Sequence, residues 1–355
     1  MSASVTSIDR LGRLLPSLLA LIGTLVVSAG IIAASGRSPV EAFAALVDGA
    51  FGSLDSLSEV GLKTCPLLLT GLAIAVAFRA GAWNIGAEGQ LLVGALAAGA
   101  LGPRLGAVPS ALGLTVTVLV ATLGGALWAG IAAGLKVRRN VNEVISTIML
   151  NFIAMGLVSY LVQGPLMEAG GRYPQTDALP QAMWMPRLTP YRVHLGLIVA
   201  LLCAGGLHVL LFRTVPGYEM RAAGLNPVAA RLAGINVNRR IVLALMLSGA
   251  LAGLAGGIEV CAVTRRVYER FSPGWGFTAI AVGLLGRLSP LGVVVAAVFF
   301  GALDAGSNAM QRVAGVSSVL VSVIQATVIL FLVALEKARW LPGPKAAAPE
   351  SAAPE

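Results

Sequence analysis

The sequence predicts an all-α, polytopic membrane protein with about ten transmembrane helices. Of its 355 residues, 57% are apolar and 12% are charged, whereas about 25% of an ordinary soluble domain is charged. The mean hydropathy is +0.86. The apolar residues also gather in runs of about 20, the length of helix needed to cross a bilayer core of ~30 Å. Soluble enzymes, nucleic-acid-binding proteins and secreted disulfide-linked scaffolds are therefore poor interpretations.

Ten apolar runs are candidates for spans. The first, 14–34, follows two arginines and exceeds the roughly 7–15 residues of a signal-peptide core, so we expect an uncleaved helix. Segment 40–60 carries acidic residues among small apolar ones and is expected to lie on the surface. The further predicted spans are 61–78, 87–102, 109–135, 141–163, 193–212, 241–262, 274–288, 290–309 and 315–335.

The distribution of basic residues predicts which side each loop faces. Ten spans place both termini on one side, and cytoplasmic loops are enriched in Lys and Arg. With the termini inside, the inner segments hold 15 of the 25 basic residues: Arg10, Arg13, Arg79, Lys136, Arg138, Arg139, Arg213, Arg221, Arg231, Arg239, Arg240, Arg287, Lys337, Arg339 and Lys345. We therefore expect a cytoplasmic N-terminus (1–13), one transmembrane domain (14–340) and a disordered, Ala/Pro-rich cytoplasmic tail (341–355).

Two segments interrupt this simple pattern. Residues 274–288 supply only about 22 Å of helix, which is too short to span cleanly. Residues 79–90 break the apolar path with three glycines and several polar groups. Irregular backbone at membrane depth is tolerated only where it is buried in protein or lines a water-filled cavity. Glycine-interrupted helices are also a sequence pointer to a transport path.

Polar side chains recur along one face of three predicted spans. Glu143, Thr147 and Asn151 are four residues apart and share a face. Asp304 and Asn308 belong to a second stripe, and Gln325 belongs to a third. Hydrogen bonding between helices is the commoner explanation for any single stripe. Three stripes together with a broken helix favour a polar translocation path.

The chain lacks the motifs of several enzyme classes. It has no GxxxxGK[ST] sequence for binding ATP phosphates, and no GxSxG or HExxH sequence. Its three cysteines stand alone in apolar stretches, without the spacing of a metal site. We expect no cofactor, no metal and no catalytic site in this chain, and no nucleic-acid partner.

Four motifs stand out along the chain: FRAGAWNIGAEGQ at 78–90, NEVISTIMLN at 142–151, RAAGLNP at 221–227 and GFTAIAVGLLG at 276–286. They resemble motifs of the permease subunits of nucleoside and simple-sugar ABC importers, within the branched-chain amino acid permease superfamily. In the last motif, Thr278 and Gly283 stand where Asp and Ala are expected. The motifs are spread over most of residues 60–335.

The resemblance implies a permease of the bacterial inner membrane that imports nucleosides or related simple sugars. Its implied partners are cytoplasmic ATP-binding cassette subunits, a second paralogous permease, an external substrate-binding lipoprotein or periplasmic protein, and membrane lipid. The third motif lies in the basic loop 213–240, where the resemblance implies a short helix that couples the permease to the ATPase. This helix would cover residues 221–235, with Asn226-Pro227 either inside it or at a turn. The matching coupling residues are Arg221, Ala222, Gly224, Asn226, Ala229, Ala230, Gly234 and Ile235. A loop that faces anionic lipid is the alternative.

Segment 79–90 is expected to form a turn at the inner mouth of the path. Asn84 and Glu88 would line the path, with Gln90 beside them. Glu88 has an alternative role, since a carboxylate at the N-terminus of the next helix is favoured by the helix dipole. The two roles remain open at this point.

Two other classes of function compete with the importer. In a secondary transporter driven by an ion gradient, Glu143 and Asp304 could carry protons. An intramembrane enzyme would need a nucleophile with an adjacent base, and the sequence offers no such pair.

Overall fold

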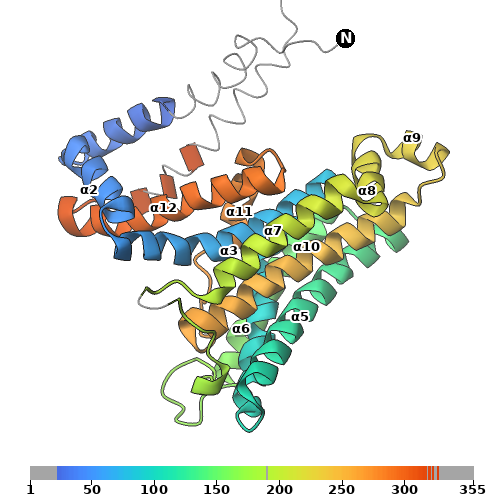
Figure 1. Cartoon of the computed structure of the whole chain (residues 1–355), viewed down its shortest axis with the longest axis horizontal. Helices are drawn as coiled ribbons and strands as arrows, with labels where there is room; N and C mark the ends of the chain where they lie inside the picture. Colours follow the sequence, from blue (N-terminus) through green and yellow to red (C-terminus); the bar gives the residue numbers. More distant parts are fainter. Residues whose placement is uncertain (1–21, 189–190, 318, 321, 324–325, 328–355) are drawn as a thin grey trace, which may run out of the picture. The chain divides into compact units, whose positions relative to one another are not determined.

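The computed structural model describes residues 22–188, 191–317, 319–320, 322–323 and 326–327. Within these ranges the regular elements are helices, accompanied by two isolated β-bridges. The chain forms two compact units: Leu46–Gly306, and the described parts of Met1–Ala45 and Ser307–Glu355 (Figure 1). The described residues are thus all-helical, and with the apolar helices below they confirm a polytopic membrane protein.

Six helices in the described part of the chain are long and apolar enough to cross a membrane. They are α3 (Leu54–Arg79), α5 (Ser110–Arg139), α6 (Glu143–Gln163), α7 (Leu195–Arg213), α10 with its π-helical extension (Val237–Thr264) and α12 (Pro290–Ala314). The helix Ile22–Ala34 and α11 (Trp275–Leu285) are shorter and apolar. The predicted span 315–335 lies largely outside the described residues.

The start of one helix differs from that expected from hydropathy. Segment 40–60 contains α2 (Pro39–Phe51) and the start of α3, which begins at Leu54 rather than at residue 61. The Ser53 hydroxyl caps α3 by accepting a hydrogen bond from the Ser56 amide at 3.0 Å, so the helix starts seven residues before the apolar run.

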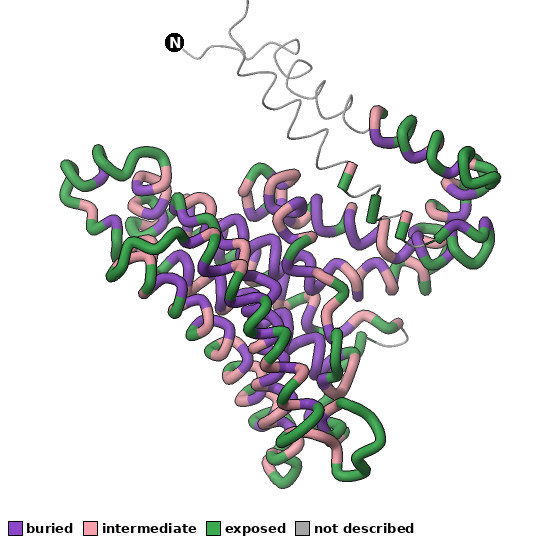
Figure 2. The backbone as a smooth tube through the Cα atoms, turned by 180° about the vertical axis from the view of Figure 1, so that it is seen from behind, coloured by how far each residue is buried: buried purple, intermediate pink, exposed green. Residues whose placement is uncertain are grey.

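Helix α10 lies at the centre of the Leu46–Gly306 unit, packed against α3, α5 and α4 (Ala87–Leu101) (Figure 1). Gly249 and Gly253 are four residues apart on α10, and a Cβ on Gly249 would overlap the backbone of Gly125 on α5, so small residues let the two helices approach closely. The share of buried residues differs from helix to helix (Figure 2). In the most apolar stretch, 83% of α3 residues are buried, against 28% in α6 and in α7.

The loops that leave α6 and α10 meet at one end of these helices. The Thr176 amide donates to the Val267 carbonyl at 2.8 Å, and Arg266 forms a 3.0 Å ion pair with Glu168. Helices α8 (Val215–Leu225) and α9 (Pro227–Leu232) follow the opposite end of α7 and precede α10.

Candidate translocation site

Residues 80–86, between α3 and α4, are not helical and are called here the irregular segment. Side chains of α6 form hydrogen bonds with part of its backbone. The Ile85 amide donates to the Thr147 hydroxyl at 3.2 Å, and its carbonyl accepts from the Asn151 side chain at 2.8 Å. Asn151 also accepts from the Gly89 amide at 2.8 Å. Two residues of the polar stripe on α6 therefore replace the hydrogen bonds that a continuous helix would have provided.

Asn84 and Gln90 form a reciprocal amide pair across the start of α4. Asn84 Nδ2 donates to Gln90 Oε1 at 2.9 Å, and Gln90 Nε2 donates to Asn84 Oδ1 at 3.0 Å. Asn84 also donates to Ser248 Oγ on α10 at 2.8 Å and accepts from the Gly86 amide at 2.9 Å. The three side chains are at most 1% exposed. This closed set of hydrogen bonds holds the irregular segment against the central helix.

Glu88 lies where the first turns of α4 and α11 meet. Its carboxylate accepts a hydrogen bond from the Gly276 amide at 2.7 Å and forms another with the Ser272 side chain. A Cβ on Gly276 would overlap the backbone of Glu88, so the contact requires glycine. The carboxylate thus occupies the position that the positive ends of two short helices favour.

Glu88 is also in the wall of a cavity of about 510 Å³. The other walls come from α4, α6 and the segment 269–273 that precedes α11. Asn84 and Gln90 are not among the lining residues.

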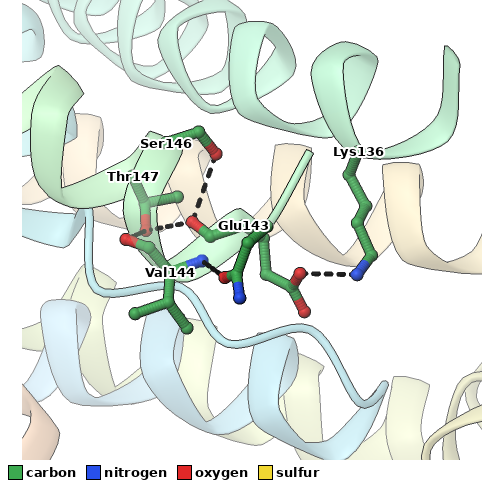
Figure 3. Close-up of polar contacts among 6 residues, drawn as sticks. Lys136, Glu143, Val144, Ser146 and Thr147 are labelled. Atoms are coloured by element: carbon green, nitrogen blue, oxygen red, sulfur yellow. Dashed lines mark hydrogen bonds and ion pairs between the residues drawn. The ribbon is translucent and has the colours of Figure 1, made fainter. Parts of the chain in front are cut away.

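Glu143 begins α6 and forms an ion pair with Lys136 of α5 at 2.6 Å (Figure 3). Its backbone carbonyl accepts from the Thr147 hydroxyl at 2.6 Å and from Ser146 at 3.2 Å. The charge of Lys136 therefore balances that of Glu143, the first residue of the stripe whose other two members bond to the irregular segment.

The remaining predicted path residues are Asp304, Asn308 and Gln325. Asp304 on α12 pairs with Lys63 on α3 at 3.5 Å. Asn308 is exposed on α12, and Gln325 lies outside the described residues. The network instead includes Ser248 and Gly276, which the sequence did not single out for this role. Ser248 adjoins the Gly249/Gly253 pair, and Gly276 opens the fourth motif, so both had a local signal.

The predicted coupling segment forms two helices, and the break between them falls at Asn226-Pro227, one of the two positions expected for this pair. Asn226 ends α8 and caps α9, accepting from the amides of Val228 and Ala229 at 3.0 Å each. Among the other coupling residues, Ala222 is half-buried, Ala229 is exposed and Ala230 is buried. Gly234 has a φ of +81°, and Ile235 packs against Ala230. Leu225 and Leu232 are 88% and 86% exposed, which leaves an apolar surface on this helix pair.

Helix α8 packs directly on the turn that follows α3. The Cα of Gly224 lies about 3.0 Å from where a Cβ on Gly81 would be, and a Cβ on Gly224 would overlap the Arg79 carbonyl. The guanidinium groups of Arg79 and Arg221 each lie 5.0 Å from the Phe212 ring. Asn84 is the third residue after Gly81, so α8 adjoins the start of the irregular segment.

Comparisons with known proteins show which family the chain resembles. The model of the branched-chain amino acid transport system permease component family matches residues 56–333. The chain is 37% identical to the guanosine ABC transporter permease protein NupP of Bacillus subtilis, over 95% of this chain and 97% of NupP. It is 36% identical to the glucose ABC transporter permease protein TsgB13 of Haloferax volcanii, over 90% and 86%. It is 31% identical to the nucleoside ABC transporter permease protein NupB of Lactococcus lactis subsp. cremoris, over 90% of each chain.

Proposed function

The chain belongs to the branched-chain amino acid transport system permease component family, and we propose from this membership that it forms the path for a nucleoside or a related simple sugar. It is a permease component of an ABC importer, not an enzyme. The single observation that carries the choice of substrate is the end-to-end match to a guanosine permease, with 95% of one chain and 97% of the other aligned.

The irregular segment and the short helices support placing the path beside Glu88. A half-buried or buried polar network at membrane depth is costly unless it serves packing or transport, and here it borders a cavity. We include in the proposed path and its supporting shell Asn84, Glu88, Gln90, Glu143, Thr147 and Asn151. Asp304, Asn308 and Gln325 stay as proposed path residues from the sequence alone.

The partners follow from the same proposal. An ABC permease works with an ATPase and a substrate-binding protein, and the exposed apolar residues Leu225, Val228 and Leu232 suit docking of the ATPase. A second paralogous permease would complete the membrane part. Both termini and the loop 213–240, which contains α8 and α9, would face the cytoplasm of a bacterial cell, and 164–191 would face outward.

Uptake measurements test this function directly. Vesicles that contain the chain with its ATPase, second permease and binding protein should accumulate labelled guanosine only when ATP is supplied. An ion gradient without ATP should give none, because the permease of an ABC importer is driven by its ATPase. Uptake by the chain alone on an ion gradient would instead establish a secondary transporter. Uptake of glucose but not of guanosine would show that the substrate is a sugar and not a nucleoside.

A further inference from the structure

The cavity beside Glu88 combines an apolar wall with a few convergent polar groups. Leu92 and Val158 form part of the apolar wall, and Phe271, 2% exposed, completes it. Ser159, Glu269 and Arg270 line the part nearer the surface, where Glu269 and Arg270 are exposed. The cavity therefore runs from an exposed rim to a buried carboxylate.

Its volume suits a small molecule. At about 510 Å³ it falls within the range of roughly 300–1,000 Å³ that is typical of ligand sites. Such sites are mostly apolar, with a small number of placed polar groups that fix the orientation of the ligand.

The charges of the lining residues select the chemistry of the ligand. An ionised carboxylate accepts hydrogen bonds and donates none, so Glu88 and Glu269 need donors such as hydroxyl groups. The rim hydroxyl of Ser159 already donates to Glu269 at 3.1 Å, which shows the geometry that a ligand hydroxyl would copy. Two carboxylates and one guanidinium give this wall a net negative charge.

An anion is excluded for a second reason. The first turns of α4 and α11 would attract a negative group, but Glu88 already occupies that position and bonds to the Gly276 amide. A phosphate entering the cavity would meet the Glu88 carboxylate rather than free backbone amides.

We propose that this cavity binds the hydroxylated ring of an uncharged ligand, a ribose or a hexose, with Glu88 and Glu269 accepting from its hydroxyl groups. The proposal rests on the proposed function, because the ring would be that of the transported nucleoside or sugar. The apolar wall of Leu92 and Phe271 would cover the face of the ring that carries C–H groups. The permease would then have a weak binding site of its own, separate from the external binding protein.

Ligand protection of a cysteine placed in the cavity tests the site. In the purified complex, without the binding protein, Ser159→Cys should react with a maleimide, and guanosine should slow the reaction at least tenfold. Gly156→Cys on the same helix is the matched control, since nothing lies within 4 Å of its Cβ position and it does not line the cavity. It should react at the same rate with and without guanosine.

Different ligands used as probes show whether the ring that binds is a ribose or a hexose. Guanine lacks the sugar and guanosine monophosphate adds a negative charge, so neither should protect Ser159→Cys. Protection by glucose but not guanosine would assign the site to a hexose. In the Ser159→Cys background, Glu269→Gln should reduce protection by guanosine about tenfold, whereas Glu168→Gln, which is outside the cavity, should not.

The binding result and the transport result can fail independently. If the unmodified complex imports guanosine while no hydroxylated probe protects Ser159→Cys, the cavity proposal is wrong and the proposed function stands. Protection by the guanine base or by the monophosphate equal to that by guanosine would also overturn it. If guanosine protects but neither guanosine nor glucose is imported, the cavity is a binding site and the proposed function is wrong.

Discussion

The carboxylate of Glu88 and the backbone amide of Gly276, 188 residues apart in sequence, are joined by a 2.7 Å hydrogen bond. The bond links the first turns of α4 and α11. Two helices too short to cross a membrane thus begin at a shared buried carboxylate, next to a cavity. Capping and lining the path are therefore roles that one side chain can serve together.

Glu88→Gln separates these two roles. The glutamine keeps an oxygen that can accept from Gly276 but loses the charge, so stability should fall by only about 1 kcal/mol, the scale of a charge at a helix terminus. Guanosine uptake should fall at least tenfold, because the proposed ligand loses a charged acceptor. Detergent melting curves and uptake assays measure the two effects. If Glu88→Gln and Asn84→Ala both transport at wild-type rates, neither residue belongs to the path or its gate.

Gly276→Ala should destabilise the protein strongly. The added methyl group would overlap the backbone of Glu88, and backbone atoms cannot rotate away as a side chain can. We expect a loss of 1–3 kcal/mol, roughly the cost of overpacking a core, read as a lower melting temperature. Gly156→Ala is the control, since it has open space around it and should be neutral or slightly stabilising. Equal melting temperatures for the two variants would contradict the close packing of α4 on α11.

Asn84→Asp should disrupt the buried amide pair. Aspartate cannot donate to Gln90 or Ser248, which leaves buried acceptors unpaired at about 1–3 kcal/mol each. Expression and melting temperature should both fall. The same change at the exposed Asn308 should have little effect on either measurement. A stable Asn84→Asp protein would mean that the amide pair does not hold the irregular segment.

Gly224→Val should uncouple transport from ATP hydrolysis without preventing membrane insertion. Its side chain would push α8 away from Arg79 and Gly81, at the start of the irregular segment. We expect uptake to fall at least tenfold while the ATPase still co-purifies. Gly205→Val on α7, where no atom lies within 4 Å, is the control and should transport normally. Normal uptake by both Gly224→Val and Arg221→Glu would make the coupling assignment wrong.

Leu232→Asp addresses the docking surface separately. The side chain is 86% exposed, so the change should leave the melting temperature of the permease unaltered. A charge in an apolar docking surface should weaken co-purification of the ATPase at least tenfold. Unchanged co-purification would mean that the ATPase does not dock on α9.

Stability in detergent should depend on pH through His194, which immediately precedes the α7 span. Burial, with Arg265 and Arg187 nearby, lowers the pKa of His194 from 6.5 to about 4. Between those values the unfolded chain binds a proton that the folded protein excludes. The contribution of His194 is therefore intact above pH 6.5 and declines as the pH falls towards 4, by about 3 kcal/mol in total.

His194→Asn checks this prediction. Asparagine can still accept from the Gly196 amide, as the His194 ring does at 3.1 Å, but it does not titrate. The melting temperature of wild type should fall more between pH 7 and pH 5 than that of the variant. Parallel pH curves for the two proteins would show that His194 is not the group responsible.

Local signals in the sequence indicated much of the site, but not its pairings. The stripe of Glu143, Thr147 and Asn151 was predicted from its spacing, and the structure puts its last two members on the backbone of the irregular segment. No spacing rule could pair Asn84 with Ser248, because 164 residues separate them and many polar side chains were available. The lysine partners of Glu143 and Asp304 likewise emerged only from the packing of separate helices.

The sequence by itself determined the membrane class, the positions of most helices and the break at 79–90, because hydropathy, helix length and glycine content are local properties. The tertiary structure decided which residues contact the break at 79–90. Only packing brought α4 and α11 together at Glu88, placed Gly224 on the turn after α3, and left a cavity beside the carboxylate. These contacts depend on which helix faces which, and that is set by the fit of all the helices together, most tightly where glycine lets two backbones meet.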